Sequence, residues 1–126
     1  MRSFIVALCI GVFMIGGCIL YMVKVENISE NLMELNNEII SMIENENYKE
    51  AEKALKKTSD YLEDKLIMLA ATGNHTELDQ MQIYISQISE YIAEEHKGDA
   101  LAHCKSLMIM FKHLPKNYRL KAENIL

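Results

Sequence analysis

The sequence is poor in the residues that make turns. Among its 126 residues there are one proline and five glycines, and there is no tryptophan. A β-sandwich or β-barrel needs many tight turns, so this scarcity argues against both. Half of the residues are hydrophobic, which is too many for a disordered chain. An all-α protein with one small domain is therefore the default expectation.

The charge balance and the motifs argue against several functions. The net charge is −5 at pH 7, so no global basic field attracts nucleic acid phosphates. The chain has no Gly-rich phosphate loop, no His-Glu-x-x-His, no Cys-x-x-Cys and no glycine-framed serine nucleophile. We therefore expect a protein that is not an enzyme, binds no nucleic acid, and needs no cofactor or metal ion.

The three cysteines do not suggest a disulfide within the chain. Cys9 and Cys18 are nine residues apart, which puts them on nearly opposite faces of a helix. Cys104 falls on the apolar stripe of its own helix and is expected to be a small buried side chain. An intermolecular disulfide or a reactive thiol at Cys104 is the alternative.

Residues 4–23 form a long apolar run with no charge between Arg2 and Lys24. Its 20 residues span about 30 Å as a helix, the thickness of a membrane's hydrocarbon core. Arg2 and the amino terminus lie on one flank, while four glutamates follow Lys24 on the other, which favours a cytoplasmic N terminus. The sequence thus predicts an uncleaved transmembrane signal anchor at residues 1–23. An extracytoplasmic domain is expected at residues 24–126, held at the cell membrane by a single pass.

A lipoprotein signal is the alternative interpretation of the same segment. Ile15-Gly16-Gly17-Cys18 has the small residues before cysteine that a lipid attachment site requires. The five apolar residues after Cys18 are unlike a usual lipoprotein tether. Both interpretations place the rest of the chain outside the cytoplasmic membrane, and lipidation of Cys18 is left open.

Helical periodicity continues after the anchor. Apolar residues recur at alternating spacings of three and four over residues 24–44, which predicts an amphipathic helix. Further helices are expected at about residues 48–71, 74–97, 99–114 and 116–124. Their short connections imply antiparallel neighbours. The expected fold is all-α, with an N-terminal transmembrane helix that continues into an antiparallel up-down helical bundle.

Residues suited to cap or end a helix lie between these segments. Asn and Asp can accept bonds from first-turn amides, Gly tolerates the left-handed conformation after a helix, and Pro lacks the N–H that a helix interior needs. The residues expected to act in this way are Asn47 with Glu50, Gly73, Asn74 with Glu77, Gly98, Asp99 and Pro115. Pro115 in particular is expected to terminate the fourth helix.

The apolar stripe of residues 24–44 continues backwards into the membrane segment, where it meets small residues. We therefore expect one helix without a hinge and with a continuous packing face. This face is the predicted seam for another membrane protein or for self-association. The seam residues are Ala7, Gly11, Ile28, Leu32, Leu35 and Ile39.

His75 and Asp79 form a possible ligand face, because residues four apart share one face of a helix. With a third ligand from elsewhere they could hold a cation. The alternative is that they are first-turn residues, where an acid complements the helix dipole. The glutamates at 26, 30, 34 and 38 are likewise either a solvated face or a cation-binding strip.

Several segments resemble a known family. They are Asn-Tyr-Lys-Glu-Ala-Glu-Lys-Ala-Leu at 47–55, His-Thr-Glu-Leu-Asp at 75–79, Gly-Asp-Ala-Leu at 98–101 and Glu-Asn-Ile-Leu at 123–126. With the short N-terminal anchor, the chain resembles bacterial domain-of-unknown-function family 4363, a family of small membrane-anchored helical proteins. The resemblance implies a protein of the bacterial cell envelope with no assigned activity, and no catalytic residue carries over.

Two functions fit these features. The first is a non-enzymatic interaction or accessory subunit of an envelope complex, held in the lipid bilayer by residues 4–23 and paired with another membrane protein or with itself. The alternative is an extracytoplasmic sensor bundle that binds a small ligand or cation and signals through a membrane partner.

Overall fold

The computed structural model describes the backbone of residues 1–71 and 75–125, and side chains through Lys116. Over these ranges it contains four helices and no strand. The helices are α1 (Arg2–Glu44), α2 (Tyr48–Ala70), α3 (His75–Ala93) and α4 (Lys97–Ile125). The expected all-α fold is confirmed.

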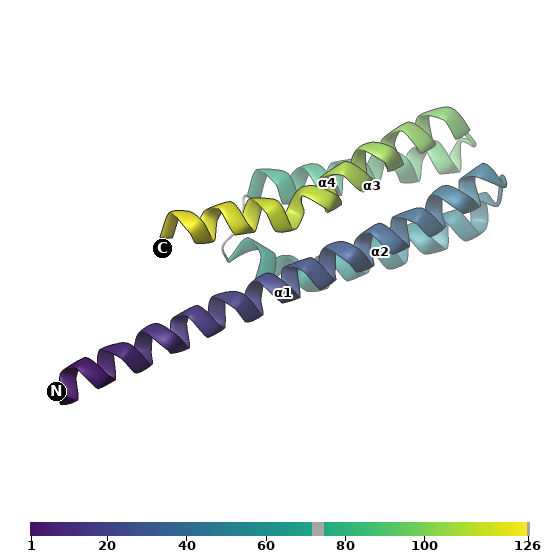
Figure 1. Ribbon diagram of the computed structural model, residues 1–126. Helices are drawn as coiled ribbons and strands as arrows, with labels where there is room; N and C mark the ends of the chain where they lie inside the picture. Colours follow the sequence, from purple (N-terminus) through teal and green to yellow (C-terminus); the bar gives the residue numbers. More distant parts are fainter. Residues whose placement is uncertain (72–74, 126) are drawn as a thin grey trace.

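The helices form an up-down-up-down bundle (Figure 1). α1 packs against α2 and α4, and α3 packs against the same two helices. The α1–α2 and α3–α4 connections lie together at one end. The end of α2, the start of α3 and the end of α4 lie at the other, beside the middle of α1. The predicted continuation of the N-terminal helix into an antiparallel bundle is confirmed.

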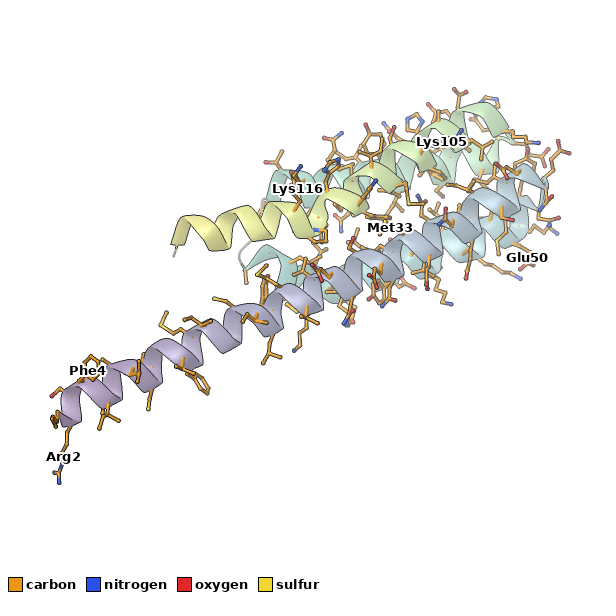
Figure 2. All side chains as sticks on the ribbon, in the orientation of Figure 1. Arg2, Phe4, Met33, Glu50, Lys105 and Lys116 are labelled. Atoms are coloured by element: carbon orange, nitrogen blue, oxygen red, sulfur yellow. The ribbon has the colours of Figure 1, made fainter. Side chains whose placement is uncertain are left out.

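The first half of α1 extends beyond the bundle. From Arg2 to Leu20 every residue is exposed except the half-buried Gly11, and contact with the other helices begins at Tyr21. Figure 2 shows the side chains around Phe4 with nothing packed against them. By length and composition this part of α1 could cross a membrane, and none of it is buried within the protein. A signal sequence has the same composition.

The buried stripe of α1 has a different phase from the predicted one. Spacings of four and three run through Val25, Ser29, Leu32, Asn36, Ile39 and Ile43, with Ile28 beside them. Leu35, which was expected on the stripe, is only half-buried. Ser29 and Asn36 are polar, so a search for apolar residues does not find them. They are buried because each binds a main-chain carbonyl of α4.

The prediction that Pro115 terminates a helix is wrong, because α4 continues through it to Ile125. Proline has no N–H, so the carbonyl of Phe111, one turn earlier, loses its usual partner. Ser29 Oγ donates a hydrogen bond of 2.6 Å to that carbonyl oxygen from α1. The neighbouring helix thus supplies the donor that proline lacks, and α4 stays helical.

The two connections at the far end have the same backbone geometry. Glu46 and Glu95 have positive φ angles of 60° and 57°. The N–H of the next residue bonds the carbonyl five residues earlier, from Asn47 to Met42 and from His96 to Tyr91, each at 2.8 Å. Both are Schellman endings with glutamate in the left-handed position that glycine usually takes.

The chain breaks between helices near the predicted cap residues, but those of them that the structure describes do not act as the predicted caps. Asn47 is the N-cap of α2, but its side chain makes no cap bond, so the capping box with Glu50 does not form. Gly98 and Asp99 lie inside the first turn of α4 rather than before it, because α3 has already ended at Ala93. Glu95 provides that turn instead of Gly98. The predicted roles of Gly73 and Asn74 lie outside the described residues.

The bundle consists of two similar hairpins, α1–α2 and α3–α4. Their loops are 49 residues apart in sequence, and buried residues recur at the same offset. The matching pairs are Ile39 with Ile88, Ile43 with Ile92, Ala51 with Ala100, Leu55 with Cys104, and Leu62 with Phe111. The hairpins differ at three buried positions, where Ser29, Asn36 and Thr58 correspond to Leu78, Ile85 and Leu107. All three buried polar residues that the structure describes therefore belong to the first hairpin.

Candidate interaction surface

The predicted seam divides into a buried part and an open part. Ile28, Leu32 and Ile39 are 4%, 0% and 0% exposed, because they pack within the protein's own core. Leu35 lies half-buried at the edge of the same helix. Ile28, Leu32 and Ile39 hold the bundle together, so they leave little apolar surface for a second protein.

The open part of the seam is Ala7 and Gly11. Ala7 is exposed, and a Cβ added to Gly11 would meet no atom within 4 Å. Ala7 is 18 residues, or five helical turns, before Val25, and Gly11 is the same distance before Ser29. Both therefore lie on the face of α1 that α2 and α4 cover farther along the helix. That face is bare between the N terminus and Tyr21.

The other face of the same segment has a hollow of its own. Two adjacent glycines lower the helix surface between bulky side chains. The hollow is lined by Leu8, Cys9, Val12, Phe13, Gly16, Gly17 and Leu20. The exposed half of α1 thus has small residues on both faces, but only the face of Ala7 and Gly11 is continuous with the bundle core.

Two side chains of α1 bind main-chain atoms of α4. Asn36 Nδ2 donates to the Cys104 carbonyl at 2.7 Å, seven residues along from the bond between Ser29 and Phe111. Both side chains are buried, and Asn36 Oδ1 has no hydrogen-bond partner. Sequence reasoning missed this pair. The available signal was their seven-residue spacing, in phase with Val25, Leu32 and Ile39.

Cys104 is fully buried in the core, as the sequence predicted. Burial raises the pKa of its thiol from 9.0 to about 12, since the thiolate would lose its hydration. Cys9 and Cys18 are exposed on α1. The core position of Cys104 leaves its thiol without access to solvent.

The predicted ligand face at the start of α3 is open to solvent. His75 and Asp79 are both exposed, one turn apart. No group of three or more His, Cys, Asp or Glu side chains within the described residues is arranged to hold a metal ion. A role for these two residues in ligand binding stays a prediction.

The far end of the bundle joins the two hairpins through polar side chains. Lys97 Nζ lies 3.8 Å from Glu46 Oε1, across the two loops. The pKa of Tyr48 is raised, first by desolvation and then by the negative charges of Glu46 and Glu95. The two loops therefore lie close enough to interact.

A protein-family model matches residues 19–125 of the chain. That model is described as a domain of unknown function (DUF4363). The chain belongs to this family. No curated protein and no solved structure matches it. The matched range covers the whole bundle of this DUF4363 protein and starts two residues before Tyr21, where α1 first contacts the other helices.

The described part of the DUF4363 bundle has hollows on its surface. A groove of about 900 Å³ runs between α2 and α3, with Leu55 and Ile85 among charged and hydroxyl side chains. Its lining residues are Lys49, Glu52, Lys53, Leu55, Lys56, Ser59, Glu63, Gln82, Ile85, Ser86, Ser89 and Glu90. A smaller cavity of about 270 Å³ between α3 and α4 is lined by Glu77, Met81, Met110 and His113. Neither hollow includes His75 or Asp79.

Proposed function

We propose that the protein is a non-enzymatic, single-pass membrane protein whose bundle is an interaction or accessory subunit of an envelope complex. The observation that carries the proposal is the bare face of α1 at Ala7 and Gly11. The same face packs against α2 and α4 once the bundle begins. Small residues on a membrane helix allow a second helix to approach closely. A transmembrane helix of a partner would therefore continue the packing that α2 and α4 provide outside.

The lipid bilayer is the first partner in this proposal. Residues 4–23 lie in the membrane, the amino terminus is cytoplasmic, and the bundle is extracytoplasmic. An α1 that runs unbroken from Arg2 to Glu44 supports a rigid link between the two regions. A partner bound at Ala7 and Gly11 would therefore also determine the orientation of the bundle. The protein needs no catalytic residue, cofactor or metal ion for this role.

Site-specific photo-cross-linking in the native membrane tests the proposal. A photoreactive residue replaces Ala7 or Gly11 in the full chain, and in control variants it replaces Cys9 or Val12, which face away from the seam. We expect a cross-linked product of defined mass from Ala7 and Gly11 and none from the controls. A mass of two chains identifies self-association, and a different mass identifies another membrane protein. Lipid adducts alone, or the same pattern at all four positions, would refute helix pairing at this face.

The groove between α2 and α3 favours the second candidate function, a sensor bundle. Its apolar floor at Leu55 and Ile85 and its charged rim suit a small amphipathic ligand. The proposal is tested by a thermal-shift screen of the full chain in detergent against small molecules and divalent cations. A sensor would show a shift that is lost in Ser86→Trp, which fills the groove, and kept in Ile109→Trp, which lies on α4. A cation effect lost in Asp79→Asn would instead point to the start of α3.

A further inference from the structure

The end of α2 carries apolar residues on all sides of the helix. Residues 66–71 read Leu-Ile-Met-Leu-Ala-Ala. Ile67 is 86% exposed, more than any other large apolar side chain described after residue 23. A helix on the surface of a water-soluble bundle normally carries polar residues on its outer face. The earlier turns of α2 follow that rule, with charged residues outside.

A hydrogen bond shows which part of α1 lies beside this end of α2. Tyr21 Oη donates to the Met68 carbonyl oxygen at 2.7 Å. Tyr21 belongs to the apolar run of residues 4–23, two residues before its end. The apolar end of α2 therefore lies beside the last turn of the apolar segment of α1.

Charged residues begin at the same level on α1 and α2. Lys24 is three residues after Tyr21 and Lys65 is three residues before Met68, so in antiparallel helices they are level. Lys24 is exposed, and Lys65 Nζ lies 3.2 Å from Asp64 Oδ2. Lys116 of α4 is at the same level by the bond between Ser29 and Phe111, but it marks no boundary, because the sequence of α4 has basic residues on both sides of it. Lysines near the end of a membrane helix reach toward the water interface.

We propose that residues 66–71, at the end of α2, lie in the lipid interface of the membrane, beside the last turn of the anchor. This inference rests on the proposed membrane anchoring. The occupant of the Ile67 surface is then lipid rather than a second protein. The apolar-to-charged boundary falls at one level on α1 and α2, as expected if a single membrane surface determines both.

The bundle stands directly on the membrane, with no exposed stalk between the anchor and its first core residues. A partner then reaches the protein through the anchor, the sides of the bundle or the far loops, while lipid covers the end of α2.

Tryptophan fluorescence in the full chain tests this placement, because the protein has no tryptophan of its own. Ile67→Trp is compared with Ile109→Trp, a matched control that is 59% exposed near the middle of α4. Phe13→Trp reports on the anchor itself. Each variant is reconstituted in phosphatidylcholine vesicles with bromine atoms, which quench tryptophan, at a shallow or a deep acyl position. We expect shallow bromines to reduce the emission of Ile67→Trp and to leave Ile109→Trp unchanged.

The outcomes separate the inference from its premise. Quenching of Phe13→Trp by deep bromines with no quenching of Ile67→Trp would overturn the placement of α2 and leave the anchor intact. No quenching of Phe13→Trp would overturn the membrane anchor. Equal quenching of Ile67→Trp and Ile109→Trp would show that the bundle lies on its side, which also contradicts the proposal.

Discussion

At the scale of single residues, Cys104 makes the stability of the bundle depend on pH. Its folded pKa of about 12 lies above the ordinary value of 9.0. Between these values the unfolded chain loses the thiol proton and the folded chain keeps it. The contribution of Cys104 to the free energy of unfolding is therefore complete below pH 9. It falls by about 1.4 kcal/mol per pH unit as the pH rises toward 12.

Urea unfolding of the full chain in detergent at pH 8 and pH 10.5 measures this effect. Cys104→Ala is expected to unfold more easily at pH 8, because a buried side chain is truncated, but to lose the contribution of the thiol to the pH slope. Tyr48, whose pKa is also raised, contributes to both proteins and cancels in the comparison. Identical slopes in the two proteins would contradict the assignment.

Asn36 is a buried residue whose side-chain amide is only partly hydrogen-bonded. Its Oδ1 is buried without a partner, which destabilises the folded state, and Ile85 occupies the equivalent position in the second hairpin. Asn36→Leu removes the unpaired acceptor at similar shape, so we expect the free energy of unfolding to rise by about 1 kcal/mol. Asn36→Asp is the control and should lower it, because it buries a charge. Thermal unfolding monitored by circular dichroism distinguishes the two, and a less stable Asn36→Leu protein would disprove the argument.

At the scale of helices, the continuity of α4 depends on α1. Ser29→Ala leaves the Phe111 carbonyl buried without a donor, which should lower the free energy of unfolding by about 1–3 kcal/mol. In a Pro115→Ala background the new N–H of residue 115 can bond that carbonyl, so Ser29→Ala should cost much less. A double-mutant cycle by urea unfolding measures the coupling. Equal costs in the two backgrounds would mean that Ser29 does not substitute for the missing N–H.

The same element shows what could be predicted from the sequence. Apolar periodicity predicted helices over the four observed regions, because burial of an apolar face is the main force that stabilises each helix. The break between Glu44 and Tyr48 was also located. Pro115 was misjudged because its effect depends on a hydroxyl 86 residues away in the chain. Apolar spacing alone also favours Leu35 over Asn36 in the core, whereas Asn36 is the buried residue because it bonds α4. Local patterns do not contain contacts between distant segments. The pairing role of Ala7 and Gly11 stays a prediction.

At the scale of the whole molecule, the charges flanking the apolar run predict its orientation. Arg2 and the amino terminus stand on one side, and Lys24 is followed by four glutamates on the other. Ser3→Cys and Asn27→Cys place reporters on the two sides without changing these charges, and Asn27 is exposed on α1. Both variants also carry Cys9→Ala and Cys18→Ala, whereas Cys104 can remain because it is buried. We expect a membrane-impermeant maleimide to label Asn27→Cys in intact cells and Ser3→Cys only after permeabilisation.

A second version of the Ser3→Cys variant, which keeps the native Cys18, distinguishes an anchor from a lipoprotein. If the signal were cleaved before Cys18, the mature chain would lack residue 3, and Ser3→Cys with its native Cys18 retained would not be labelled even after permeabilisation. Its mass would also fall by the lost residues and rise by the attached lipid. An anchored chain keeps its full mass and its label at residue 3. In both cases the bundle begins within one helical turn of Cys18, because Tyr21 already contacts α2, so the bundle lies close to the membrane with either attachment.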